Sequence, residues 1–237
     1  MSMESELLSE TGQLVGPKVD TRPAARPGTV TLEGRFGRVE RLNAERHGPA
    51  LWEALEGRLE LWTYSSNGPF TAGTAFREWV AQREALADPF YYAIVDPAGR
   101  ALGVAALMEI RPATRVVEIG HIVYGPALQR SPLATAAQYL LARTVFEELG
   151  YRRYEWKCHA LNAASRRAAS RLGFTFEGIF RQHMIVKGRT RDTAWFSMLD
   201  REWPRVRAAF EQWLDPANFD ADGRQRRRLE DIRDTIG

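Results

Sequence analysis

The most informative part of this chain is Asn162-Ala163-Ala164-Ser165, which is followed by Leu172-Gly173-Phe174 and Glu177-Gly178. Asparagine is favoured as the capping residue at the start of a helix, and glycine adopts the left-handed backbone that ends one. The stretch therefore predicts a short amphipathic helix over 162–172 and a strand directly after it. A second strand-to-helix junction, Gln129-Arg130-Ser131-Pro132-Leu133-Ala134-Thr135, lies upstream.

Strand and helix patterns fill the chain on both sides of these junctions. Strands are expected over 29–34, 39–42, 90–95, 101–110, 116–124, 154–158, 174–186 and 193–199, and helices over 43–55, 72–86, 132–149, 162–172 and 200–214. Thr71 is expected to cap the helix over 72–86. A helix between the strands over 116–124 and 154–158 predicts a crossover and parallel pairing of those two strands. The three strands between 90 and 124 are expected to be antiparallel.

Length and composition indicate one domain of ordinary size. The chain has 237 residues, of which 44% are hydrophobic and 27% charged. We expect a loosely ordered arm over 1–28, a folded domain over 29–215 and a polar helical tail over 216–237. No apolar run approaches the ~20 residues that span a bilayer, and the first thirty residues do not resemble a secretory signal. A cytoplasmic protein is therefore expected.

The single cysteine and the basic residues carry little functional information. Cys158 excludes an intramolecular disulfide, and its alternating apolar surroundings favour a small buried hydrophobe over a reactive thiol. The net charge is only +3. Acidic residues directly follow the basic run Arg224-Gln225-Arg226-Arg227-Arg228, which favours a solvated helix end over a nucleic-acid patch.

The two strand-to-helix junctions, in this order and with these residues, resemble the GNAT superfamily of N-acetyltransferases. The likeness is strongest to ribosomal-protein N-terminal acetyltransferases and their relatives that modify small molecules. The resemblance implies a single mixed, mainly antiparallel sheet that is flanked by helices and splayed where the cofactor enters. It also implies direct transfer of an acetyl group from acetyl-CoA to an amine, without a metal and without a covalent acetyl-enzyme. Dimers are common among such relatives.

The upstream junction corresponds to the loop that holds the CoA pyrophosphate in this superfamily. Backbone N–H groups at a helix start, together with the helix dipole, stabilise negative charge. Pro132 stands where the family has its central glycine, so one N–H donor is lost. An ordinary capped helix is the alternative. The resemblance assigns cofactor binding to Ile122, Val123 and Tyr124, which would pair with pantetheine amides, and to Gln129, Arg130, Ser131, Leu133, Ala134 and Thr135 in the loop.

The helix over 162–172 carries the residues expected near the CoA thiol. In the ribosomal-protein branch that this chain resembles, an Asn-x-x-Ser sequence places the amide near the pantetheine arm and the hydroxyl near the thiol. The resemblance assigns these places to Asn162 and to Ser165, one turn on, which could protonate or hydrogen-bond the departing thiolate. Simple helix capping is the alternative for both residues. Many members of the superfamily place a tyrosine acid in this helix, but Ala169 occupies that position here. Ser165 is therefore the better candidate for the thiol-side role.

An amine must lose a proton before it attacks a thioester, so a base is needed. Glu118 lies on the strand that leads into the CoA loop and is the candidate base, directly or through water, with a solvent-facing carboxylate as the alternative. His121 is an alternative base with a suitable intrinsic pKa. On a regular strand its odd separation from Glu118 predicts opposite faces. Glu109 and His183 are weaker candidates.

An aromatic-rich segment between the first two helices is expected to wall the acceptor site. In the similar branch this segment contributes to that wall, and Trp62, Tyr64 and His121 are therefore candidate acceptor-binding residues. Core packing is the alternative for Trp62 and for Phe70.

Two other functions are compatible with the sequence. A non-catalytic module that binds acyl-CoA would explain Pro132 and the missing tyrosine. A nucleic-acid-binding protein would explain the pI of about 9.2, although this reading is disfavoured by the acids beside the basic run. The identity of the amine acceptor does not follow from the sequence.

Overall fold

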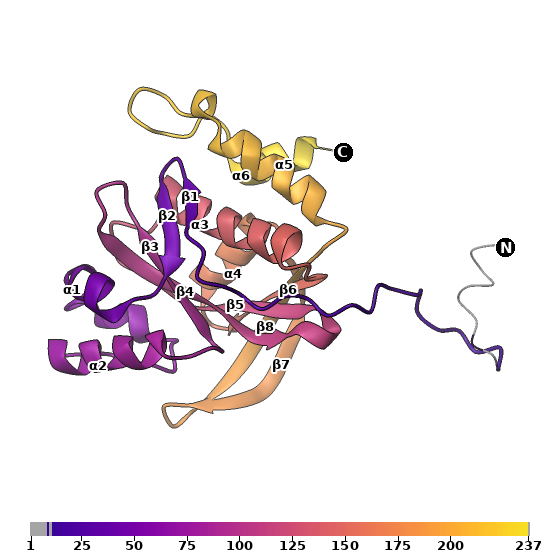
Figure 1. Ribbon diagram of the computed structural model, residues 1–237, viewed down its shortest axis with the longest axis horizontal. Coiled ribbons are helices and arrows are strands. Elements are labelled where there is room, and N and C mark those ends of the chain that lie inside the picture. Colours follow the sequence, from indigo (N-terminus) through magenta and orange to yellow (C-terminus); the bar gives the residue numbers. More distant parts are fainter. Residues whose placement is uncertain (1–8, 10, 237) are drawn as a thin grey trace.

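Eight strands form one sheet in the computed structural model, which describes residue 9 and residues 11–236 (Figure 1). The strands are β1 (Leu32–Gly34), β2 (Gly37–Arg41), β3 (Phe90–Val95), β4 (Ala101–Arg111), β5 (Val116–Tyr124), β6 (Arg153–His159), β7 (Thr175–Val186) and β8 (Arg189–Leu199). Their order in the sheet is β1-β2-β3-β4-β5-β6-β8-β7. β5 and β6 are parallel and the other neighbours are antiparallel, which confirms the mixed, mainly antiparallel sheet.

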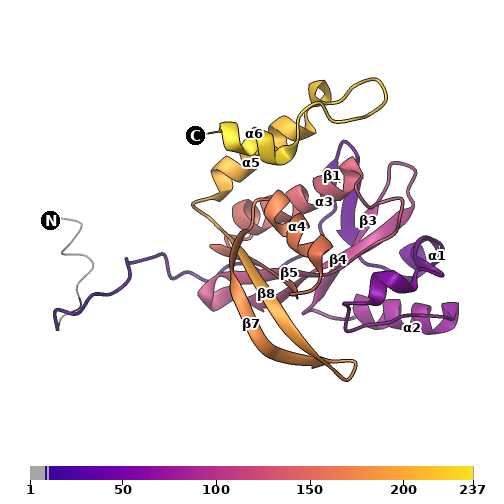
Figure 2. The same cartoon turned by 180° about the vertical axis from the view of Figure 1, so that it is seen from behind.

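Helices cover the two faces of the sheet unequally. They are α1 (Ala44–Leu55), α2 (Gly73–Glu84), α3 (Pro132–Arg143), α4 (Ala163–Arg171), α5 (Trp203–Leu214) and α6 (Leu229–Thr235). α1 and α2 pack on one face, against β3 and β4, whereas α3 to α6 lie on the other side (Figures 1 and 2). α1 and α2 cover only one end of their face of the sheet. On the same face no helix covers β6 and β8, and the long β7–β8 hairpin projects beyond the rest of the sheet.

Two hydrophobic cores hold these layers together. The first core lies under α3 to α6 and includes Val117 and Ile119 of β5 with Tyr154 and Trp156 of β6. The second lies under α1 and α2, where Trp62, Phe70, Phe76 and Trp79 pack through ring contacts of 5.0–5.6 Å. Successive side chains of a strand point to opposite faces of the sheet, and the two cores lie on opposite faces. A residue whose neighbours along the strand enter one core therefore faces the other core.

Most predicted elements are confirmed within a few residues. The strands over 90–95 and 116–124 have the expected bounds, and Asn43 and Asn162 cap α1 and α4. Thr71 was expected to cap α2, but Ala72 holds that position and makes no side-chain cap. The helix expected over 132–149 is α3 followed by one π-helical turn, Thr144–Glu148. β8 begins at Arg189 rather than at 193.

Both terminal segments touch the domain. Residues 1–8 and 10 of the expected arm lie outside the described residues, but the amides of Ala24 and Ala25 donate to Pro112 and Leu149. The expected polar tail is only partly polar, since Leu229 and Ile232 of α6 are buried in the first core. The basic run precedes α6, as a loop. Within the described part of the chain, no helix combines the length and the apolar character needed to cross a bilayer.

Gly37, at the β1–β2 turn, offers a test of the packing between sheet and helix. Its φ is +138°, and an added Cβ would lie 2.3 Å from the Val95 carbonyl oxygen and 2.9 Å from a Leu133 methyl group. Gly37→Ala is therefore expected to destabilise the fold by about 3 kcal/mol, lowering Tm by roughly 6–12 °C in thermal unfolding. Gly99→Ala is the control, because Gly99 also has positive φ but has nothing within 4 Å. Equal losses in both variants would contradict the steric argument.

Candidate active site

The parallel strands β5 and β6 pair along only part of their length. Four residues of β5, from Val116 to Ile119, pair with Arg153 to Trp156 of β6, and beyond them the strands separate. The second half of β5, over 120–124, therefore has a backbone edge that β6 does not pair. An edge of this kind can bind an extended chain that carries amides, as β-strand addition does. This geometry fits the expected pantetheine arm along Ile122, Val123 and Tyr124.

A β-bulge at His121 reshapes β5 where the strands part. The His121 ring stacks on Tyr91, which belongs to the core under α1 and α2.

Glu118 lies on the face of the sheet that α1 and α2 cover, as His121 does. It alternates with Val117 and Ile119, whose side chains enter the core on the opposite face. The expectation that His121 and Glu118 face opposite sides is therefore wrong. The positive φ of the bulge turned the imidazole over, and the two side chains share the face on which the acceptor would lie.

Glu118 is a buried carboxylate with one cationic partner. Lys157 Nζ lies 3.0 Å from Glu118 Oε2 and 3.2 Å from Glu155 Oε2, and it sits 3.9 Å over the Trp195 ring. Burial raises the pKa of Glu118 to about 7, although Lys157 opposes this effect. The carboxyl group is thus half ionised near neutral pH, the range in which a general base is most effective.

The neighbouring Glu155 has a different environment. Arg153 Nε donates to Glu155 at 2.8 Å, and Arg111 and Lys157 also pair with it. Burial alone would raise the pKa of Glu155, but these three cations together lower it. Two buried carboxyl groups on adjacent strands therefore have pKa values shifted in opposite directions. Glu155 is ionised at neutral pH, whereas Glu118 is only partly ionised.

His121 is a poorer base than Glu118. Burial and the charges of Arg83 and Arg191 lower the pKa of His121 to about 4, so the ring is neutral at pH 7 and holds a proton weakly. Its Nδ1 lies 3.5 Å from the side-chain nitrogen of Asn67. Of the weaker candidates, Glu109 is exposed on β4, and His183 bonds Thr193 at 3.0 Å and lies 5.9 Å from the Trp195 ring.

The segment over 59–72 and the tip of the β7–β8 hairpin close one side of the site. Lys187 Nζ, at the tip, donates to the carbonyl oxygens of Trp62 and Asn67, both at 3.0 Å. Tyr64 Oη donates to Leu161 O at 3.3 Å, and the Tyr64 ring lies 5.2 Å from the His159 ring. Tyr64 is 37% exposed, whereas Trp62 is 2% exposed. For Trp62 the alternative of core packing is the arrangement found.

At the start of α4, Asn162 and Ser165 take up capping geometry and leave polar atoms available. Asn162 Oδ1 accepts from the Ser165 amide at 3.1 Å. Ser165 Oγ accepts from Trp156 Nε1 at 3.0 Å, so its own hydrogen can be donated elsewhere. Ala169 is fully buried in the first core. Burial raises the pKa of the nearby Cys158 thiol, which Ser165 partly offsets, and the thiol is thus kept protonated.

The first turn of α3 offers fewer N–H donors than a glycine-rich loop would. Ser131 Oγ accepts from the Ala134 amide at 3.1 Å, and Pro132 has no N–H. The Gln129 side chain donates to the Tyr124 carbonyl oxygen at 2.9 Å.

The other residues of this loop differ in exposure. Thr135 is buried and accepts from Arg171, and the Leu133 side chain is also buried. Arg130 is exposed and has φ of 59°. An anion at this helix start would meet the Arg130 guanidinium and the Leu133 amide, which lies between Pro132 and the capped Ala134 amide.

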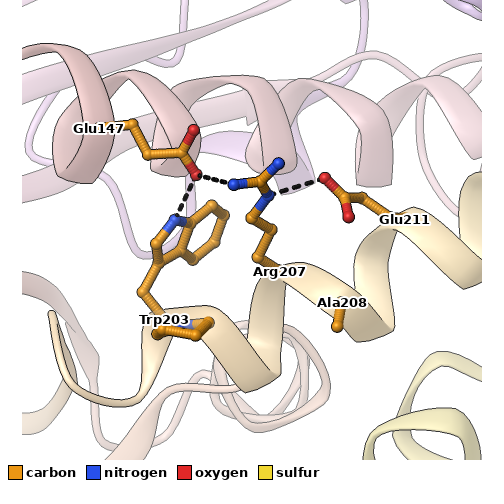
Figure 3. A pocket seen from close by; sticks show the side chains of 6 residues that line it. Glu147, Trp203, Arg207, Ala208 and Glu211 are labelled. Carbon is orange, nitrogen blue, oxygen red and sulfur yellow. Dashed lines mark hydrogen bonds and ion pairs between the residues drawn. The ribbon is translucent and has the colours of Figure 1, made fainter.

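Charged side chains also cluster elsewhere among the described residues. The part of the chain that the structure describes contains no group of three or more His, Cys, Asp or Glu side chains that could hold a metal ion. A hollow beside α5 is lined by residues that bond one another: Trp203 Nε1 donates to Glu147, and Arg207 pairs with Glu147 and Glu211 (Figure 3). Its charges are satisfied internally.

Several residues of the site were not predicted from the sequence. They are Asn67, Lys157, Lys187 and Arg191, and each enters through long-range contacts. The alternation of β6 places Glu155 and Lys157 on one face, a signal that was available. That this face meets Glu118 depends on the register between β5 and β6, which the sequence does not specify.

Comparisons with known proteins agree with the geometry. The family model of the acetyltransferase (GNAT) domain matches residues 40–175. The chain is 30% identical over 151 residues to YdaF of Bacillus subtilis, whose name describes a ribosomal N-acetyltransferase; the match covers 62% of this chain and 80% of YdaF.

Solved structures extend the likeness over most of the fold. A GCN5-related N-acetyltransferase from Brucella melitensis is 48% identical with a TM-score of 0.88, covering 90% of this chain and 98% of that one. A GNAT-family protein from Chromobacterium violaceum is 41% identical with a TM-score of 0.75, covering 81% and 99%.

Proposed function

The chain belongs to the GNAT acetyltransferase family, and on that premise we propose that it transfers the acetyl group of acetyl-CoA to a primary amine by direct attack. The acceptor is the N-terminus of a peptide or the amine of a small molecule. The observation that carries this proposal is Glu118, a buried carboxylate with a pKa of about 7, next to the point where β5 and β6 part. The name of YdaF supports a ribosomal protein as one acceptor to test.

Direct attack is favoured because the site offers no good nucleophile of its own. Cys158 is buried and its thiol pKa is raised by burial, so little thiolate is present at neutral pH. Glu118, directly or through a water that it orients, removes a proton from the acceptor ammonium. The neutral amine then forms the new C–N bond at the thioester carbon, and the C–S bond breaks. As the amide forms, the nitrogen releases its second proton, and the departing CoA thiolate takes up a proton to leave as the thiol.

On the other side of the reaction, Ser165 is the donor to the departing sulfur. Its Oγ accepts from the Trp156 indole, which leaves the hydroxyl hydrogen available for the sulfur. Asn162 adds a side-chain amide, whose oxygen caps α4 and whose NH₂ group can donate to a carbonyl of the pantetheine arm. Acetyl-CoA would be held by the open edge of β5 and, at its pyrophosphate, by Arg130 at the start of α3.

Calorimetry with acetyl-CoA, followed by a CoA-release assay over a panel of peptides and small amines, tests the proposal. We expect acetyl-CoA binding and turnover with at least one primary amine. The alternative of a non-catalytic acyl-CoA module is motivated by the reduced donor set at the Pro132 turn. Binding without turnover across the whole panel would favour that module and contradict the enzyme.

Ser165→Ala tests the thiol-side role. The variant loses the hydroxyl donor but keeps the backbone N–H that Asn162 caps, so α4 should persist. We expect kcat to fall about tenfold or more, the low end of what one acid or hydrogen-bond donor contributes, while acetyl-CoA binding stays near that of the wild type. Ser170→Ala, on the same helix, is the control. An unchanged kcat in Ser165→Ala would reduce the hydroxyl to a structural role.

A further inference from the structure

Arg191 lies at the mouth of the gap between β5 and β6. The pairing of β6 with β8 ends at His159 and Thr193, and the Ala160 amide donates to the Asp192 carbonyl oxygen just beyond. Arg191 is therefore the second residue of β8 past the end of β6, after Asp192. It shares a face with Thr193 and Trp195, the face on which Lys157 and Glu118 also lie.

The Arg191 guanidinium has no partner among the residues that the structure describes. It makes no hydrogen bond or ion pair there, and its Nε is buried without an acceptor. Arg111, Arg153 and Lys157, on the same face, each pair with a carboxylate. A partly buried, permanently charged group without a partner is costly, and such groups concentrate where a ligand supplies the partner.

The surroundings of Arg191 are those of the reacting groups. After the larger effect of burial, its charge lowers the pKa of both His121 and His159, and it also acts on the Cys158 thiol. The carboxylate that acts on the Arg191 charge is Glu118, which raises the pKa of the guanidinium against the larger, opposite effect of burial.

The other charged groups at this mouth are already engaged. Arg83 donates to Asn67, and Lys187 donates to two carbonyl oxygens. The Asp192 carboxylate accepts from the Gln182 amide. The mouth therefore holds three cations, Arg83, Lys187 and Arg191, against the carboxylates of Glu118 and Asp192.

We propose that Arg191 binds a carboxylate of the acceptor, so that the preferred acceptor is a primary amine with a carboxylate a few bonds away. This inference rests on the proposed function. Glu118 serves the ammonium end of such a zwitterion and Arg191 its carboxylate end, by the paired N–H···O bonds that guanidinium and carboxylate groups form. The carboxylate belongs either to a free amino acid or to an acidic side chain near the N-terminus of a peptide.

The test uses acceptors in matched pairs that differ in the carboxylate. Amino acids are compared with the corresponding decarboxylated amines, such as phenylalanine with phenethylamine. Peptides with Asp or Glu at the second or third position are compared with the same peptides carrying Asn or Gln. The enzymes are the wild type, Arg191→Gln, Arg191→Lys and, as control, Arg189→Gln, which removes an exposed arginine from the same strand.

In at least one set of pairs, kcat/KM of the wild type is expected to favour the carboxylate-bearing member by about tenfold or more. Arg191→Gln should abolish that preference, Arg191→Lys should keep part of it, and Arg189→Gln should keep all of it. The set that shows the preference identifies the source of the carboxylate. Calorimetry with acetyl-CoA should give the wild-type affinity for every variant, which also shows that each is folded.

Three results would overturn the inference while leaving the proposed function intact. The wild type would turn over amines without preferring a carboxylate, Arg191→Gln would slow both members of each pair equally, or Arg191→Gln would weaken acetyl-CoA binding. A wild-type enzyme that acetylates no amine at all would instead overturn the proposed function, and this inference with it.

Discussion

Glu118→Gln is expected to lower turnover by about 10²–10⁴-fold, the contribution of a positioned general base. Glutamine keeps the size of the side chain and can still contact Lys157, which lies 3.0 Å from Glu118 Oε2, but it cannot take a proton. Acetyl-CoA affinity should stay close to that of the wild type, because the carboxylate serves the amine and not the cofactor. Steady-state kinetics and calorimetry together separate these two effects.

The pH dependence gives the sharper measurement. Burial raises the pKa of Glu118 to about 7, so the carboxyl group is protonated, and unable to accept a proton, below that pH. In the wild type, turnover should therefore rise with pH through about 7, beyond any change that the ionisation of the amine itself imposes. In Glu118→Gln this additional rise should be absent. The amine is common to both enzymes, so the difference between the two profiles isolates Glu118.

Two other carboxylates serve as comparisons. Glu53→Gln removes an exposed carboxylate of α1, and turnover should stay unchanged. Glu109 is exposed on β4, yet its charge is among those that raise the pKa of Glu118. If Glu109→Gln lost the activity and Glu118→Gln kept it, the base would have been assigned to the wrong residue.

The sequence predicted well whatever depends on local pattern. The uninterrupted apolar run of β3 and the apolar positions of β5 predicted both strands with their correct ends. Asn162 and Gly173 marked the start and the end of α4, since capping and left-handed backbone are properties of single residues. Parallel pairing of β5 and β6 followed from the helix between them.

Features that depend on tertiary register were predicted less well. The strand pattern places His121 opposite Glu118, but the bulge turns it to the same face. Gly120, directly before it, is the one local signal of a bulge, since glycine inside a strand often marks one. Trp62 is as apolar as a binding wall would need, yet ring contacts with Phe70 and Trp79 hold it in the core. Arg191 comes near enough to Glu118 and His121 for their charges to interact only because β8 extends past the end of β6.

Lys157→Met is expected to move the acid limb of the activity profile to higher pH. Lys157 is the one cation within ion-pair distance of Glu118 among the described residues, and its attraction opposes the effect of burial. Without it the pKa of Glu118 rises further, so the base form appears only at a more alkaline pH. A neighbouring cation typically lowers a carboxyl pKa by about 1–3, and the limb should therefore shift by roughly that many pH units. At pH 7 turnover should fall about tenfold or more, and much of it should return at pH 9.

The shape of the profile separates this positioning role from a merely structural one. Damage to packing under Trp195 or to the pairing of Glu155 would lower the rate by the same factor at every pH. Lys157→Arg, which keeps the charge, should leave the limb near its wild-type position. Glu155 keeps Arg111 and Arg153 in both variants, so its own ionisation should persist. A Lys157→Met enzyme whose acid limb coincides with that of the wild type would show that Lys157 does not control the charge of Glu118.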